Sequence, residues 1–140
     1  MFKQISVYLL NRPGELANFA DLLVENNIEI RALTVAENDE YGLVLFLVDD
    51  PEKYIEPLDK EGHIYSITEV LVVKVISKEG HTKGLQEISR ILGNNGLNIE
   101  YLYSALAKDE PLLILRIDNN NKALNILKEK GFLSEEIEKF

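Results

Sequence analysis

The sequence predicts an α+β protein built from two tandem copies of one βαββαβ unit. The chain repeats itself at a constant offset of 69 positions, the difference between Leu85 and Leu16. Each copy shows strand-type and helix-type hydrophobic periods in the same order, and 140 residues are enough for two small units with their own cores.

The repeat runs without a gap through most of one copy. A constant offset that persists through helices, strands and turns indicates duplication of a supersecondary unit. We therefore predict a first domain over residues 1–69 and a second over residues 70–140. The matching pairs are Leu16 with Leu85, Leu23 with Leu92, Asn26 with Asn95, Ile30 with Ile99, Leu33 with Leu102, Ala36 with Ala105, Leu43 with Leu112, Asp49 with Asp118, Lys53 with Lys122, Leu58 with Leu127, and Gly62 with Gly131.

The first copy begins with alternating Ile5, Val7 and Leu9, which is typical of a strand. Apolar residues then recur at helical spacing, and Asn26-Asn27 can end that helix because Asn tolerates the left-handed conformation. Asp50 is expected to cap a second helix, in which Pro57 should cause a kink or weaken one hydrogen bond. The predicted elements are a strand at 5–9, a helix at 16–23, strands at 28–37 and 43–48, a helix from 50 to 62, and a strand at 64–68.

The second copy repeats this order, and the two right-handed crossovers in each copy give a ferredoxin-like sandwich. Each sandwich has four antiparallel strands with two helices on one face. We expect the two sandwiches to pair side by side into one antiparallel sheet. The predicted elements are strands at 71–76, 98–107, 112–117 and in the tail at 132–140, with helices at 85–92 and 123–127.

Composition excludes several functional classes. Fifteen basic against 24 acidic residues give a net charge of −9, which repels phosphate backbones and anionic lipids. We expect no nucleic acid and no membrane as partner. The absence of cysteine excludes disulfides and thiolate catalysis. No apolar run approaches the roughly 20 residues of a membrane helix, and no signal peptide is evident, so a cytoplasmic protein is expected.

The chain shows no constellation typical of an enzyme. His63 and His81 have no histidine or cysteine at ligand spacing, so no metal site is expected. GxSxG, Walker and GxGxxG patterns are absent. The acidic pairs at 49–50 and 135–136 are interpreted as a helix cap and a solvated tail. Tyr101 and Tyr103 could stack on bases, but the net charge argues against this. We predict a protein that is not an enzyme, with no catalytic residues and no cofactor.

The informative segment is Asn11-Arg12-Pro13-Gly14-Glu15-Leu16, which leaves a strand and opens a helix. Pro fixes one dihedral and Gly permits a tight turn, so the free amides of the first helical turn point outward. Such a corner suits a carboxylate. The carbonyl oxygen of Asn11 could contact the ammonium of the same ligand. The alternative is an ordinary strand-to-helix turn with nothing bound.

NRPGELANFADLL followed by NNIEIRAL resembles the ACT domain, a small regulatory module that binds amino acids. The segment GLQEISRILGNNGLNIEYLYS is similar to the same domain with its helix-opening loop degraded. The resemblance covers nearly the whole chain as two tandem ACT domains. It implies that an effector amino acid binds between two domains. The helix-opening loop of one then meets the start of the second strand of its neighbour, where an Asn often hydrogen-bonds the ligand.

Carrying the resemblance over residue by residue predicts one good site in an asymmetric protein. The first copy has the Pro-Gly loop but holds Glu29 where the family has Asn, whereas the second copy has Asn98 but lacks Pro-Gly. In the pseudo-symmetric site, formed by residues 78–85 with Glu29, the carboxylate would repel a ligand carboxylate unless His81 or Lys83 compensates. The predicted ligand-binding residues are Asn11, Arg12, Pro13, Gly14, Glu15, Leu16, Leu97, Asn98 and Ile99.

The apolar run at 43–48 also predicts association. Helices cover only one face of a sheet, and two copies side by side leave the other face bare, so we expect a homodimer that packs face to face. The functional prediction is a regulatory protein that binds a small amino-acid effector. Two alternatives stay open: a regulatory subunit of an amino-acid biosynthetic enzyme, similar to the small subunit of acetolactate synthase, and an acylphosphatase-like hydrolase, which only Arg12 supports.

Overall fold

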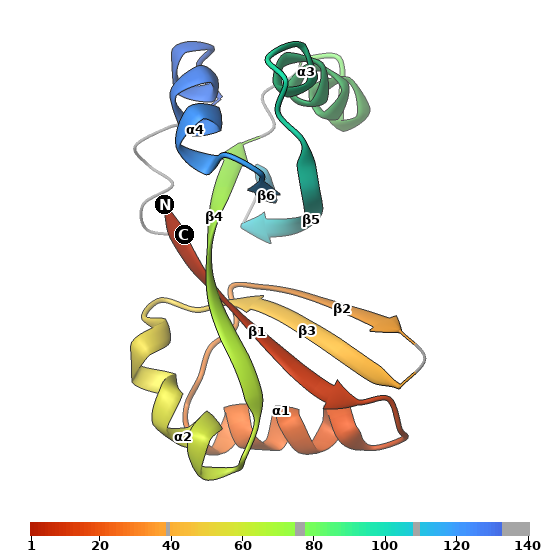
Figure 1. Ribbon diagram of the computed structural model, residues 1–140, viewed down its shortest axis with the longest axis vertical. Coiled ribbons are helices and arrows are strands. Elements are labelled where there is room, and N and C mark those ends of the chain that lie inside the picture. Colours follow the sequence, from red (N-terminus) through yellow and green to blue (C-terminus); the bar gives the residue numbers. More distant parts are fainter. Residues whose placement is uncertain (39, 75–77, 108–109, 133–140) are drawn as a thin grey trace. The chain divides into compact units, whose positions relative to one another are not determined.

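The computed structural model describes residues 1–38, 40–74, 78–107 and 110–132. It divides into an N-terminal unit, Lys3–Thr68, and a C-terminal unit that runs from Glu69 onward and includes Met1–Phe2. Both units combine antiparallel strands with helices, so the predicted α+β class is confirmed (Figure 1). Each unit is described by itself below, and side-by-side pairing of the two stays a prediction.

The N-terminal unit has the predicted βαββαβ order. Strand β3 pairs antiparallel with both β1 and β2, and the strand order is β2-β3-β1-β4. Its elements are β1 (Phe2–Leu10), α1 (Glu15–Glu25), β2 (Ala32–Asn38), β3 (Tyr41–Leu47), the 3₁₀ helix η1 (Pro51–Tyr54), α2 (Ile55–Lys60) and the first part of β4 (Ile64–Lys74).

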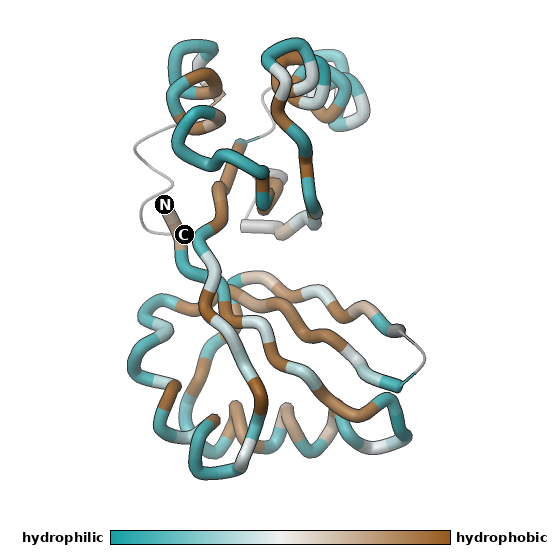
Figure 2. The backbone as a smooth tube through the Cα atoms, viewed as in Figure 1, coloured by the Kyte–Doolittle hydropathy of each residue, from teal (hydrophilic) through white to brown (hydrophobic). Residues whose placement is uncertain are grey.

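The core of this unit lies between the helices and one face of the strands. Alternate residues of β1 point to opposite faces, so Ile5, Val7 and Leu9 enter the core together. Phe19 of α1 meets Phe46 of β3 edge to face, with ring centroids 5.7 Å apart. Figure 2 shows by colour the apolar residues along the strands of this unit.

The C-terminal unit repeats the plan within its described residues. Strand β6 pairs antiparallel with β4 and with β5, and Leu71, Val73, Leu113 and Leu115 pack with the helices in a second core. The predicted tail strand lies outside the described residues. The elements of this unit are the rest of β4, α3 (His81–Asn94), β5 (Ile99–Ala107), β6 (Glu110–Ile117) and α4 (Asn120–Glu129).

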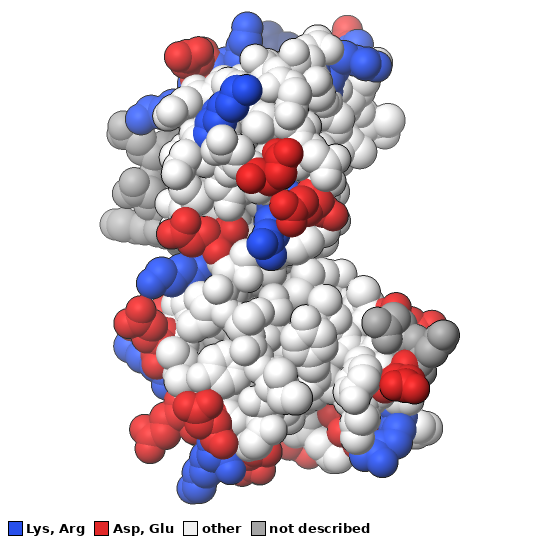
Figure 3. Space-filling model, viewed as in Figure 1, with Lys and Arg blue, Asp and Glu red and all other residues white. Residues whose placement is uncertain are grey.

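The face of each sheet that points away from the helices carries both buried and exposed residues. In the N-terminal unit Leu45 and Leu47 are buried on that face, beside the buried polar side chains of Gln4 and Ser6. In the C-terminal unit Val70, Val72, Leu112 and Ile114 are buried too. An exposed apolar patch remains at the far end of the N-terminal sheet: Tyr8, Leu10 and Tyr41 are 43–46% exposed. Figure 3 shows broad uncharged surface over this unit.

Several element boundaries differ from those predicted. The strands predicted at 64–68 and 71–76 are one uninterrupted strand, β4, as far as Lys74. Strand β2 begins at Ala32 rather than at residue 28, and Ile28 packs in the core instead. The side chain of Asp50 makes no cap hydrogen bond.

The helix that Pro57 was predicted to kink is divided into two helical segments instead. The segment after β3 starts as the 3₁₀ helix η1 and becomes α-helical only at Ile55. Pro57 thereby falls in the first turn of α2, where its missing N–H leaves no helical hydrogen bond unmade. The equivalent helix α4, which has Ile126 at this position, runs unbroken for 10 residues.

Candidate functional site

The loop between β1 and α1 is a tight turn held by its own backbone. The Asn11 amide donates to the Glu40 carbonyl at 3.1 Å, and the Arg12 amide donates to the Leu10 carbonyl at 2.9 Å. Gly14 takes a left-handed conformation (φ 85°) that L side chains rarely adopt, and α1 starts at the next residue. The Pro-Gly pair therefore sets the point at which the helix begins.

The first turn of α1 leaves part of its donors unused. The Glu15 amide donates to the Arg12 carbonyl at 3.3 Å, and the Asn18 amide closes the first helical bond to Gly14 at 2.9 Å. Gly14 provides no side-chain cap. Within the described residues, the amides of Leu16 and Ala17 find no backbone acceptor. Two adjacent N–H groups at the positive end of a helix are thus available to an anionic group.

Polar side chains surround this corner. The Arg12 guanidinium pairs with Glu15 at 2.7 Å, and the Asn11 side-chain amide donates to the Glu37 carboxylate at 2.6 Å. With its NH₂ group directed at Glu37, Asn11 keeps its carbonyl oxygen as an acceptor. The charges of Arg12, Glu15 and Glu37 sum to −1, so the corner has donors for a carboxylate but a net charge that favours a cation.

The second copy has no such loop. In the stretch equivalent to the Pro-Gly loop, α3 already begins at His81, directly after Gly80 (φ 109°). At the offset of 69, helix α3 ends at the residue equivalent to the end of α1 but starts three residues earlier, since Gly84 corresponds to Glu15. The extra residues His81, Thr82 and Lys83 replace Arg12, Pro13 and Gly14. A helical turn therefore occupies the place of the Pro-Gly corner.

Asn98 lies in a well-anchored segment of the C-terminal unit. Its amide donates to the Asp118 carboxylate at 3.0 Å, and its carbonyl accepts from the Asp118 amide at 3.1 Å. The Asn98 side chain is exposed, as is Glu29 at the equivalent position. Ile99 is half-buried at the start of β5, whereas Leu97 is buried in the core.

The predicted site residues thus form two groups, each within one unit. Residues 11–16 lie together at the β1–α1 corner, where all except Glu15 are exposed. Leu97, Asn98 and Ile99 lie together before and at the start of β5. Sequence reasoning identified both groups, but it did not foresee that Glu37 would bind Asn11, because β2 is far from the loop in sequence.

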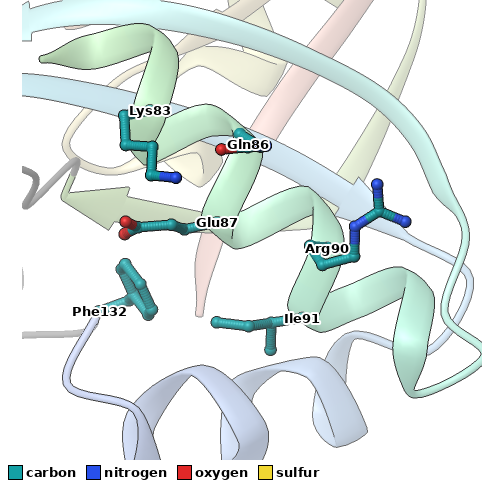
Figure 4. Close-up of a pocket in the computed structure, with 6 residues that line it drawn as sticks. All are labelled: Lys83, Gln86, Glu87, Arg90, Ile91 and Phe132. Atoms are coloured by element: carbon teal, nitrogen blue, oxygen red, sulfur yellow. The ribbon is translucent and has the colours of Figure 1, made fainter. Parts of the chain in front are cut away.

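Sequence reasoning also missed a pocket of about 380 Å³ in the C-terminal unit. It lies between one side of α3 and Phe132, which comes three residues after the end of α4 (Figure 4). A charged stripe at helical spacing on α3 was the available signal. The lining residues are Lys83, Gln86, Glu87, Arg90, Ile91 and Phe132.

Other ionisable groups have structural partners. The His63 ring packs edge-on against Phe19 with centroids 5.4 Å apart. Burial raises the pKa of Tyr103 well above its usual range.

In the described part of the chain no three His, Cys, Asp or Glu side chains gather as metal ligands. None of the described helices is long and apolar enough to span a bilayer.

Solved structures with the same architecture cover nearly the whole chain. Protein BT0572 from Bacteroides thetaiotaomicron is 30% identical, with a TM-score of 0.81 over 92% of this chain and 88% of its own. The ligand-free regulatory subunit of aspartate kinase from Thermus thermophilus is 18% identical, with a TM-score of 0.68 over 93% of each chain. The corresponding subunit from Thermus flavus is 15% identical, with a TM-score of 0.60 over 91% of this chain and 90% of its own.

A search of curated protein sequences found no match. A family model described as an ACT domain pair matches residues 1–138 of the sequence, which is almost the full length. The duplicated sandwich and the Pro-Gly helix-opening loop agree with this match, and the chain belongs to the family of ACT domain pairs.

Proposed function

We propose that this chain is a non-catalytic regulatory protein that binds a free amino acid at the β1–α1 corner. The observation that carries the proposal is the pair of amides at Leu16 and Ala17, which lack a backbone acceptor in the described residues and follow the loop that begins at Asn11. Membership of a regulatory domain family supports it. The extra turn of α3 supports a single site of this kind in each chain.

The chemistry of the corner suits the two charged groups of an amino acid. The ligand carboxylate accepts from the amides of Leu16 and Ala17, and the ligand ammonium donates to the carbonyl oxygen of Asn11 and to Glu37. The resemblance adds Asn98 and Ile99 from the second copy as the other side of the site. Because the corner carries a net charge of −1, aspartate and glutamate should bind more weakly than neutral or basic amino acids.

Calorimetry with the twenty amino acids tests the proposal. Gly14→Val should abolish binding, because a β-branched side chain strains the left-handed backbone that places the amides. Gly62→Val is the matched control: Gly62 also has a positive φ and open space around it, but it lies after α2. Asn98→Ala should weaken binding about tenfold through loss of one hydrogen bond to a charged group. Binding that survives both Gly14→Val and Asn98→Ala would remove the site.

A second candidate function is that of a regulatory subunit of an amino-acid biosynthetic enzyme. It is favoured by the likeness in fold to the two aspartate kinase regulatory subunits. The sequence resemblance also suggested an acetolactate synthase type of partner. Affinity purification of the tagged chain from its own cells tests this: a large catalytic chain should be retained, and its retention should change with the amino acid that calorimetry identifies. Recovery of the chain alone argues for a stand-alone protein.

A further inference from the structure

The pocket beside α3 has its charged groups on one stripe of the helix. Lys83, Glu87 and Arg90 recur at intervals of four and three residues and therefore share a face. In Figure 4 the side chains of Lys83 and Glu87 both extend into the space over the Phe132 ring, whereas the Arg90 guanidinium points away from it. Within the described residues no ion pair joins Lys83 to Glu87. A cation and an anion thus line the same pocket without a direct ion pair between them.

The floor of the pocket is apolar and held in place by a helix C-terminal motif. The Gly131 amide donates to the Lys128 carbonyl at 3.1 Å, and the Phe132 amide donates to the Leu127 carbonyl at 3.0 Å. Gly131 has a positive φ of 80°, as this kind of helix ending requires. Phe132 is therefore fixed against the core, and half-buried Ile91 on α3 completes the floor.

The first copy has no equivalent of this pocket chemistry. At the offset of 69 its lining would be Gly14, Ala17, Asn18, Asp21, Leu22 and His63. Lys83 corresponds to Gly14, so the extra turn of α3 that removes the Pro-Gly corner is also what places a lysine here. At the same place in the fold, the first copy therefore has the Pro-Gly corner and the second copy has a helical turn that carries Lys83.

We infer that this pocket is a binding site for a zwitterionic amino acid with an apolar side chain, of the leucine or phenylalanine type. The ligand carboxylate meets Lys83, its ammonium meets Glu87, and its side chain lies on Ile91 and Phe132. The volume of about 380 Å³ is within the usual range of small-molecule pockets. The site is independent of the β1–α1 corner, so either can exist without the other.

The test is an amide NMR titration of the full chain with leucine and phenylalanine. The Gly14→Val variant serves as background, so that ligand at the β1–α1 corner does not contribute. Shifts should be confined to α3 and the end of α4. Glu87→Gln should weaken leucine about tenfold but leave 4-methylpentanoate, which lacks the ammonium, unchanged. Lys83→Gln should weaken both.

Matched controls come from α2. Glu56→Gln and Lys60→Gln remove the same charges from an exposed pair with the same spacing, and both should leave the affinity unchanged. The inference is overturned if leucine shifts no α3 resonance in the Gly14→Val background. It is also overturned if the affinity is insensitive to both Lys83→Gln and Glu87→Gln. Shifts at residues 11–16 in the wild-type chain report separately on the proposed function.

Discussion

Asp49 organises the turn that follows β3. One of its carboxylate oxygens accepts from the Asp50 amide at 2.9 Å and from the Tyr54 hydroxyl at 3.1 Å. These hydrogen bonds lower the pKa of Asp49 below its ordinary value of 3.8, and the bond from the Asp50 amide contributes more than the bond from Tyr54. The ionised side chain thus stabilises the start of η1, a role that the sequence assigned to Asp50.

This pKa shift predicts a pH-dependent contribution to stability. A carboxyl group with a lowered pKa stabilises the fold above its unfolded pKa, and this contribution is lost as the pH falls through the folded pKa. Urea unfolding should show Asp49→Asn less stable than wild type near pH 7. The gap should narrow as the pH falls below about 3.8, the ordinary value. A gap that stays constant down to about pH 2 would contradict this assignment.

Helices α1 and α3 are followed by a left-handed residue at equivalent positions, but the residue is Asn in one copy and Gly in the other. After α1, Asn27 adopts a left-handed conformation (φ 55°), and after α3 the equivalent Gly96 does so at 70°. The preceding asparagines cap both helices in the same way: the Asn26 and Asn95 side chains donate to the carbonyls of Leu22 and Ile91 at 2.8 and 2.7 Å. Only the second copy has the residue that this conformation favours.

Asn27→Gly should therefore stabilise the chain by roughly 0.5–1 kcal/mol, because glycine relieves the left-handed strain. The measurement is the urea midpoint, which should rise with an unchanged slope. Asn26→Gly is the control, since Asn26 has a negative φ and donates a cap hydrogen bond, and it should destabilise the chain. A fall in midpoint for Asn27→Gly would show that the Asn27 side chain contributes more than its strain costs.

At the scale of whole elements, hydrophobic period was enough to predict the strands of both described sheets and all the α-helices. It was not enough for the start of α3, because His81, Thr82 and Lys83 are polar and both Gly80 and Gly84 can precede a helix. The predicted loop residues 11–16 lie together as expected, since Pro13 and Gly14 determine a local turn. The α3 pocket escaped prediction because Phe132, which lies after α4 and far from α3 in sequence, completes it.

At the scale of the whole molecule, we expect association through the exposed patch formed by Tyr8, Leu10 and Tyr41. In a two-fold dimer a second copy of the chain would cover this patch with the same patch of its own. Light scattering at micromolar concentration should give twice the chain mass of 15.9 kDa, and Tyr8→Lys should reduce it to the monomer. Val24→Lys on α1 is the control, since Val24 is 75% exposed outside the patch. A wild-type monomer would rule out this dimer.

Strand β4 passes from one unit to the other between Thr68 and Glu69 without interruption. Junctions between domains usually fall in an exposed, flexible linker, which is where proteases cut. Here the junction is extended backbone within a strand, so digestion should nick the chain elsewhere first. Limited proteolysis is accordingly expected to release neither duplicated copy as an intact half.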